Sequence, residues 1–566
     1  MDQTYFYKHN PLVKNIFLKM LFPTILMNLT TAIASLADTV IIGYFLDDIA
    51  LSVVTFATPL YMIINTFAAL YAVGGPIGMS IDTGKGEKAS ANRIFSLSVE
   101  LLFFTGMVIL LCGAFLGRQI TAWLGAEPDV FDMVYTYSTI VMFGAPIFML
   151  NTGLAFFVRN DGRPNLATTG MFVSIAVDMV TNIIFVGPMQ MGVAGAAYST
   201  VLGQLVSVFI IGSHLFSKKC TLRFRFTCNT AAFRIMRNGF STALHFIYQF
   251  FTILLMNHFV VSLAGTGGVV VYTVVFNLYT VSLSLFEGIS QTIQPMVSTY
   301  YGEKSNHNIK NTMRLAVITT VILCGAVTVL LEIFPQVVPI LFGIEDSLLI
   351  AQSSLAVRIY AISMIIMTIN VVIGYYLQSS EYSLMSAILV SLRCCILFLA
   401  CAFIFGKMFG MNGIWAAYTV AEIFTFLIFL LMVSIKRKTL EKKGIHADYY
   451  LLDKDMEKAT DCLTFCSNKD SFANYETAVC SSLAQNEHLS EDVLCNSKSY
   501  LSCLKLGLAE NKTVHIEVEI NGAERKVIIR DDMDHGTLPE NIQDALSGES
   551  NTEYGPVLGK NRVCLK

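Results

Sequence analysis

The sequence predicts an all-α polytopic membrane protein, with twelve transmembrane helices in two six-helix bundles and a small cytoplasmic α+β domain after them. Three observations predict this fold class. Hydrophobic residues make up 54% of the chain and charged residues 14%, whereas a soluble domain has roughly 25% charged residues. Apolar segments recur along most of the chain, and the two halves of that apolar part resemble each other.

The apolar segments are about 20 residues long or more, which is the length needed to cross roughly 30 Å of hydrocarbon. They recur up to about residue 435 and then stop. We expect twelve spanning helices, at residues 14–45, 50–74, 94–116, 131–157, 166–188, 191–213, 235–263, 269–293, 311–333, 350–376, 384–406 and 412–435.

Loop charge predicts the orientation of these helices. Basic residues follow the even-numbered segments, whereas the opposite loops carry acids such as Asp47 and Asp129. By the positive-inside rule, we expect both termini to be cytoplasmic. The expected location is a bacterial cell membrane, inner or plasma, which the chain crosses several times. The basic residues include Lys85, Lys88, Arg93, Arg159, Arg163, Arg223, Arg225, Arg234, Arg237, Lys304, Lys310 and Arg314.

The two halves of the apolar part match at an offset of about 218 residues. GMSIDTGKGEKASANRIF (78–95) aligns with MVSTYYGEKSNHNIKNTM (296–313), and MGVAGAAYST (191–200) aligns with MNGIWAAYTV (411–420). Six helices per repeat give bundles of parallel topology, at 1–215 and 216–435, around a central cavity. Rocking of such bundles is typical of secondary transporters, whereas a channel more naturally uses identical subunits around a pore.

Several motifs resemble the multidrug and toxic compound extrusion family, over residues 1 to about 435. They are SLADTVIIGYF, TGKGEKASANRIF, FFVRNDGRPNLAT, TNIIFVGPMQMGVAGAAYST and ISQTIQPMVSTYYGEKS. The resemblance implies an exporter, not an enzyme, that uses a H⁺ or Na⁺ gradient to expel amphipathic organic cations and requires no cofactor. The alternative within the same superfamily is a flippase for lipids or lipid-linked glycans.

Asp38 is the one acid between Met20 and Leu46. A carboxylate at membrane depth costs about 3 kcal/mol on insertion scales, so it is retained where it faces protein or water. Either Asp38 has a function, or it lies near a helix end and reaches water. The family resemblance, which includes Thr39 and Gly43, implies that Asp38 binds the coupling cation. Asp38 is the one position where Na⁺ is expected, and no other metal is expected.

The fifth helix supplies the expected partners of Asp38. Family members pair the helix-one acid with an Asn and an acid four residues later; here Asn182 is present but Val186 replaces the acid. Asp178 lies one turn before Asn182 on the same helix face, as a substitute acid or as a coincidental polar contact. Thr200 and Asn28 can add oxygen ligands or make ordinary helix–helix hydrogen bonds.

Glu287 is the other acid expected deep in the membrane, as a second titrating site in the C-terminal bundle or as the partner of a basic residue. Some family branches have essential acids in helices seven and ten, where this chain has His245 and Asn370. That departure argues against a sodium site in the C-terminal bundle. Arg358 and Arg393 are expected to snorkel at helix ends or to form structural pairs.

A basic linker at 436–450 leads to a cytoplasmic domain at 451–566. HIEVEI (515–520), Asn521-Gly522 and KVIIRD (526–531) predict a β-hairpin, and helices are expected near 473–486 and 490–508. Cys462 and Cys466 form a lone Cys-x₃-Cys without a second pair or nearby His, so no zinc site is expected.

This domain resembles the ATP-binding domain of histidine kinases and anti-sigma-factor kinases. Asp492 and Asn496 match the acid and Asn of its helix, and Asp532 and Gly536 match a strand end of the form Asp-x-Gly-x-Gly that has lost its first glycine. Gly555 and Gly559 stand where the family has a phosphate loop before a short helix. The resemblance implies a degenerate ATP site.

The tail also supports a competing hypothesis, a membrane-anchored sensor or regulator. Such a kinase needs a phosphoacceptor His on a dimerisation helix, and His446 lacks a long amphipathic coil. The expected partners are organic cations, the lipid bilayer and a cytoplasmic regulatory protein bound by the tail. No nucleic acid is expected, and the chain is expected to be a monomer.

Overall fold

The structure is a computed structural model of the chain. It describes residues 11–46, 48–125, 128–217, 220–226, 231–344, 346–454, 460–467, 480, 497, 514–521, 526–534, 552–558 and 560–565. Within these residues twelve helical stretches are long and apolar enough to cross a membrane, which confirms the predicted number.

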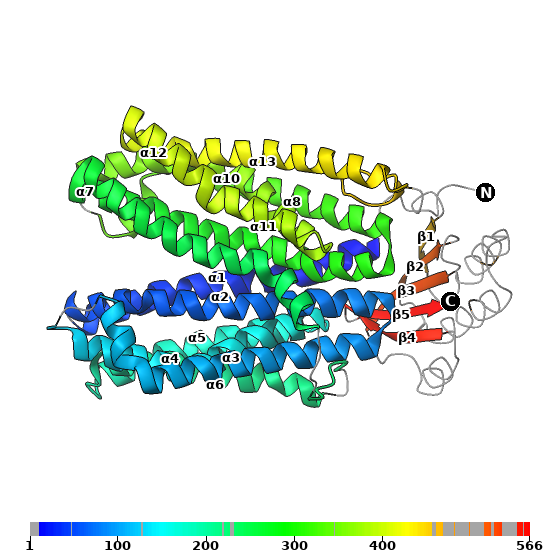
Figure 1. Ribbon diagram of the computed structural model, residues 1–566, viewed down its shortest axis with the longest axis horizontal. Coiled ribbons are helices and arrows are strands. Elements are labelled where there is room, and N and C mark those ends of the chain that lie inside the picture. Colours follow the sequence, from blue (N-terminus) through cyan, green and yellow to red (C-terminus); the bar gives the residue numbers. More distant parts are fainter. Residues whose placement is uncertain are drawn as a thin grey trace.

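The first half of the chain forms six helices, here called the N-lobe: α1 (Pro11–Phe45), α2 (Asp48–Lys85), α3 (Lys88–Trp123), α4 (Phe131–Asn160), α5 (Pro164–Val186) and α6 (Gly192–Gly212). The helices of the second half, here called the C-lobe, are α7 (Ala232–Glu303), α8 (Asn306–Ile333), α9 (Val337–Leu341), α10 (Ser347–Ser379), α11 (Ser383–Ser391), α12 (Leu397–Phe409) and α13 (Met411–Glu441). The N-lobe is blue to cyan in Figure 1 and the C-lobe is green to yellow.

Three helices differ from the predicted spans. Helix α7 contains the seventh and eighth spans, which meet at Gly265, where φ is 62°; a glycine adopts this angle without a Cβ clash. The eleventh span is divided by a π-helical turn, η3 (Leu392–Ile396). Helix α2 continues to Lys85 rather than ending near Gly74, because its glycines serve packing rather than helix termination.

The lobes pack along α2 and α7, which lie side by side in Figure 1. A Cβ on Gly74 would lie 2.0 Å from the carbonyl oxygen of Ile235. A Cβ on Gly84 would lie 2.1 Å from the oxygen of Thr299, and one on Gly302 would lie 2.1 Å from that of Ile81. Gly84 and Gly302 are equivalent in the repeat, so the two repeats meet at matching glycines.

The first helix of each repeat contributes to the core of the other lobe. Phe17 and Met20 of α1 lie in the same buried cluster as C-lobe residues, and Ile235 and Ala243 of α7 lie in a cluster of N-lobe residues. These four residues lie near the beginnings of α1 and α7, and both helices begin at the end of the bundle nearest the C-terminal sheet (Figure 1). We call this end of the bundle the tail side, and it is closed by direct packing.

The tail contains five strands: β1 (Thr460–Ser467), β2 (Val514–Asn521), β3 (Lys526–Asp534), β4 (Thr552–Val557) and β5 (Lys560–Leu565). Their order is β1-β2-β3-β5-β4, and every neighbouring pair is antiparallel. The predicted hairpin is present as β2–β3, with Asn521 opposite Lys526. Apart from Cys480 and Ser497, the predicted tail helices fall outside the described residues.

The expectation of a phosphate loop followed by a short helix at 554–563 is wrong. These residues form the β4–β5 hairpin, in which Gly555 lies opposite Arg562. The segment is a hairpin rather than a loop because β5 pairs with both β3 and β4, so its backbone groups are hydrogen-bonded within the sheet. Asp532 lies within β3, whereas Asp492, Asn496, Gly536 and Gly559 lie outside the described residues.

Candidate functional site

The N-lobe interior contains a buried carboxylate with uncharged partners. Asp178 and Asn182 lie one turn apart on α5 and are 6% and 0% exposed. The hydroxyl groups of Ser199 and Thr200 on α6 approach the Asp178 carboxylate. Gly203 allows this close packing, because a Cβ there would lie 3.1 Å from Cβ of Asp178.

Helix α1 runs parallel to α5 and brings Asp38 to the same level. The Thr168 hydroxyl donates a hydrogen bond to the Pro23 carbonyl (2.8 Å), and Gly187 lies against the Phe45 ring at the other end. At about 1.5 Å of rise per residue, Asn182 lies about 21 Å beyond Thr168 and Asp38 about 22 Å beyond Pro23. The backbone of Asp38 is therefore level with Asn182; its side chain lies outside the described residues.

Asn28 belongs to a different network, between the lobes. The side-chain amides of Asn28 and Gln291 exchange two hydrogen bonds of 3.1 Å. Gln291 Oε1 also accepts from Nη1 of Arg159 at 3.1 Å. Arg159, which loop charge had placed after the fourth helix, lies within α4 and is 1% exposed. Asn28 therefore contributes to packing of the lobes rather than to the Asp178 cluster.

The C-lobe interior contains a buried ion pair. Arg393 Nε lies 2.8 Å from Glu422 Oε1, and Asn370 Nδ2 donates to Glu422 Oε2 at 2.7 Å. The π turn that contains Arg393 leaves the Cys394 carbonyl available to accept from the Thr252 hydroxyl (2.9 Å). A π turn of this kind is often found at functional positions in helices.

Two small cavities flank this ion pair. They have volumes of about 40 and about 30 Å³, and His245 and Arg393 line both. Glu287 and Asn370 line the smaller cavity. A polar cavity of this size holds a water molecule or two, since roughly 10–15 Å³ suffices for one. Glu287 therefore shares a polar pocket with Arg393.

The sequence reasoning missed Glu422. Glu287 was expected to be the only deep acid besides Asp38 and Asp178, but Glu422 is 6% exposed and buried in α13. Its signal was present, because Glu422 is the single charge in AAYTVAEIFTFLIF (416–429). Arg393 was expected either to snorkel at a helix end or to form a structural pair, and it forms a pair with Glu422.

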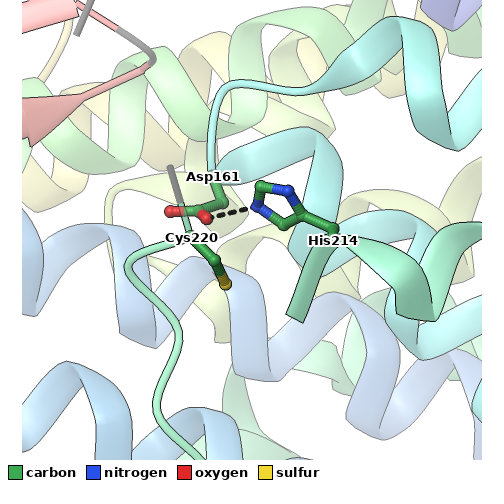
Figure 2. A group of neighbouring side chains, drawn as sticks. All are labelled: Asp161, His214 and Cys220. Carbon is green, nitrogen blue, oxygen red and sulfur yellow. Dashed lines mark hydrogen bonds and ion pairs between the residues drawn. The ribbon is translucent and has the colours of Figure 1, made fainter. Parts of the chain in front are cut away.

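A third group of polar side chains, Asp161, His214 and Cys220, lies at the ends of α4 and α6 (Figure 2). The donor atoms of Asp161, His214 and Cys220 all lie within 4.8 Å of one another. His214 Nε2 lies 2.6 Å from Asp161 Oδ2, and both the amide and the hydroxyl of Thr221 donate to the same carboxylate. These hydrogen bonds connect the C-terminal ends of α4 and α6 to the segment that follows α6.

Two repeated halves that meet at matching glycines, each with a buried polar cluster, define a polytopic membrane transporter. The MatE family model matches the chain twice, at residues 23–185 and 241–404, once in each repeat. The chain belongs to the MatE family.

Several known proteins are similar over the membrane part. A multidrug export protein, MepA, of Staphylococcus saprophyticus is 21% identical over 78% of this chain and 97% of the relative; MepA of Staphylococcus aureus gives the same values. A MATE crystal structure in complex with MaL6 has a TM-score of 0.72 at 20% identity, covering 77% of this chain and all of that one. A MOP superfamily transporter from Pyrococcus furiosus has a TM-score of 0.68 at 21% identity, covering 75% and 97%.

Proposed function

We propose that the protein exports amphipathic organic cations in exchange for H⁺ or Na⁺, and that the N-lobe cluster couples the two movements. The observation that carries this proposal is the Asp178 carboxylate, which is buried on α5 one turn from Asn182 and is approached by the hydroxyl groups of Ser199 and Thr200. No described lysine or arginine forms an ion pair with Asp178. A buried carboxylate without a protein cation favours a proton or a metal ion as its partner.

Asp38 would complete this site from α1. Its backbone is level with Asn182, and a second carboxylate there would make the site able to hold Na⁺ by oxygen ligands. Binding of the ion would neutralise the cluster and disfavour a cationic substrate in the same lobe. This competition is what antiport requires, because an ion and a substrate that exclude each other must cross in opposite directions.

We place the tail side in the cytoplasm. Arg93, Arg223, Lys304 and Lys310 lie at or near helix ends on the tail side, whereas Asp346 lies at the opposite end of the C-lobe. This charge distribution follows the positive-inside rule. Export then means movement of the substrate away from the tail side.

A lipid or glycan flippase of the same superfamily predicts a basic central cavity able to hold a pyrophosphate. The buried arginines of the described interior are engaged instead: Arg159 with glutamines and Arg393 with Glu422. The acidic N-lobe cluster therefore favours export of cations over transport of an anionic lipid.

The test is uptake of ethidium into inverted vesicles under an imposed pH or sodium gradient. The intact chain is expected to accumulate ethidium with one of the gradients. Asp178→Asn and Asp38→Asn are expected to abolish the gradient dependence, because each removes a carboxylate that the ion neutralises. Asp132→Asn, at an exposed aspartate in the first turn of α4, is the matched control and should transport normally.

Two results would count against the proposal. Gradient-driven uptake that survives in both cluster variants would exclude the N-lobe cluster as the coupling site. Absence of uptake with either gradient, in correctly inserted protein, would favour the flippase alternative.

A further inference from the structure

The charged face of the C-terminal sheet is buried against the membrane part. Residues of β2 alternate, with Ile516, Val518 and Ile520 on one face and Glu517 and Glu519 on the other, and all five are at most 1% exposed. A charged sheet face is normally solvated, since burying a charge is costly unless it is paired. The burial of this face therefore indicates a specific partner surface.

Arg530 and Glu303 connect the sheet to the C-lobe. Arg530 lies opposite Glu517 in the sheet, and its Nη1 is 3.2 Å from Glu517 Oε1 and 3.1 Å from Glu519 Oε2. Its Nη2 pairs with Glu303, the last residue of α7. Asn308 of α8 also donates to Glu517 at 2.6 Å. The sheet is thus paired with α7 and α8 through fully buried groups.

Arg562 extends the contact to the N-lobe. Its Nε lies 2.8 Å from Glu303 Oε1, and its Nη1 and Nη2 donate to the carbonyls of Thr83 (3.2 Å) and Gly84 (2.8 Å) at the end of α2. Lys526 Nζ donates to the Glu303 carbonyl at 2.8 Å. The last carbonyls of a helix lack partners within the helix and attract cations. The sheet therefore caps one helix end from each lobe.

The rest of the tail is attached to the C-lobe. The hydroxyl groups of Tyr376 and Tyr382 donate to the carbonyls of Tyr450 (2.6 Å) and Leu451 (3.2 Å). Lys310 Nζ lies 2.9 Å from Asp448 Oδ2. These contacts hold the chain between α13 and the sheet against α8, α10 and the start of α11. Motion of the C-lobe would thus carry the tail with it, and the Arg562 hydrogen bonds to α2 would have to break.

We propose that the C-terminal sheet is an autoinhibitory latch. The sheet is attached to the C-lobe and binds the end of α2 through Arg562. It thereby holds the tail-side ends of the two lobes together. It does so where Gly84 and Gly302 bring α2 and α7 into backbone contact. The tail side opens only when this contact breaks. The latch goes beyond the proposed export function, and its test needs no substrate.

The test is hydrogen–deuterium exchange of the purified full chain, resolved by mass spectrometry. Arg562→Ala removes the contacts with Glu303, Thr83 and Gly84. We expect exchange at the tail-side ends of α2 (80–88) and α7 (298–305) to rise at least several-fold, because the latched state loses population. Arg314→Ala, an exposed arginine on α8, is the matched control and should leave exchange unchanged.

A second variant separates the latch from simple unfolding of the sheet. Glu303→Gln lies outside the sheet and weakens the contact from the side of the lobes. It should raise exchange at the same two helix ends while the β2–β3 hairpin stays protected. Unchanged exchange at α2 in both variants, or a rise in Arg562→Ala alone, would overturn the latch.

Discussion

The two lobes share a fold but differ in how they treat a buried carboxylate. In the N-lobe, Asp178 is approached by the hydroxyl groups of Ser199 and Thr200 on α6, and no described cationic side chain pairs with it. In the C-lobe, Glu422 is held by Arg393 and Asn370. The Glu422 carboxylate is therefore balanced by a cationic side chain of the protein, whereas the Asp178 carboxylate has no such partner among the described residues.

On the proposed function, this difference in charge balance separates a coupling site from a structural site. A carboxylate with a permanent cation gains little from binding a proton or Na⁺, because its charge is already balanced. A carboxylate with only neutral ligands has an affinity for either ion. On the proposed function, the N-lobe cluster serves ion coupling, whereas the ion pair of the C-lobe serves stability.

The largest expected effect comes from breaking the C-lobe pair. Arg393→Leu leaves Glu422 as a buried unpaired charge and should lower the free energy of unfolding by about 3–5 kcal/mol. Arg393→Leu with Glu422→Leu should recover most of this loss, because both charges are gone. Thermal unfolding in detergent measures both variants, with the exposed Arg358→Leu as the control. Equal stability of Arg393→Leu and the intact chain would contradict a structural role for the pair.

A smaller effect is expected when the second partner of Glu422 is removed. Asn370 donates to the Glu422 carboxylate and to its backbone carbonyl, at 2.7 and 2.9 Å. Asn370→Ala should cost about 1–3 kcal/mol, the range for leaving a buried polar group unsatisfied. Asn257→Ala, at an exposed position on α7, should cost less than about 0.5 kcal/mol. If the two variants unfold at the same temperature, Asn370 does not stabilise the pair.

The smallest expected effect lies in the N-lobe and concerns function rather than stability. Thr200→Val keeps the shape of the side chain but removes a hydroxyl that approaches Asp178. Loss of one hydrogen bond, about 0.5–1.5 kcal/mol, should raise the ion concentration for half-maximal transport by roughly 2- to 13-fold. Thr136→Val, whose hydroxyl is exposed on α4, is the control. An unchanged ion dependence would remove Thr200 from the site.

Much of the fold could be predicted because it depends on local hydrophobicity. Twelve apolar segments give twelve spans, and alternation in HIEVEI predicts a strand with a partner. Helix ends were less predictable where glycines occur, because Gly74 and Gly84 permit contact between helices instead of ending one. Their role depends on α7, which is more than 150 residues away in the sequence.

The site could be predicted only in part. Spacing of four residues was enough to place Asp178 and Asn182 on one face, since helical periodicity is local. Asn28 lies on α1, but its partner Gln291 is on α7. This pairing depends on how the two lobes pack, which local periodicity does not predict. Glu422 carried the same signal as Asp38, a lone acid in an apolar run. The charged face of the sheet could not be assigned a partner from sequence, because Arg562 meets α2 only in the folded chain.

The most direct test of the central claim is competition between ion and substrate in purified protein. Binding of a fluorescent organic cation is measured by titration at a series of pH values and sodium concentrations. In the intact chain and in Glu287→Gln, one of the two ions is expected to weaken cation binding. In Asp178→Asn, binding is expected to be independent of both ions. Loss of the competition in Glu287→Gln with its retention in Asp178→Asn would place coupling in the C-lobe and contradict the account.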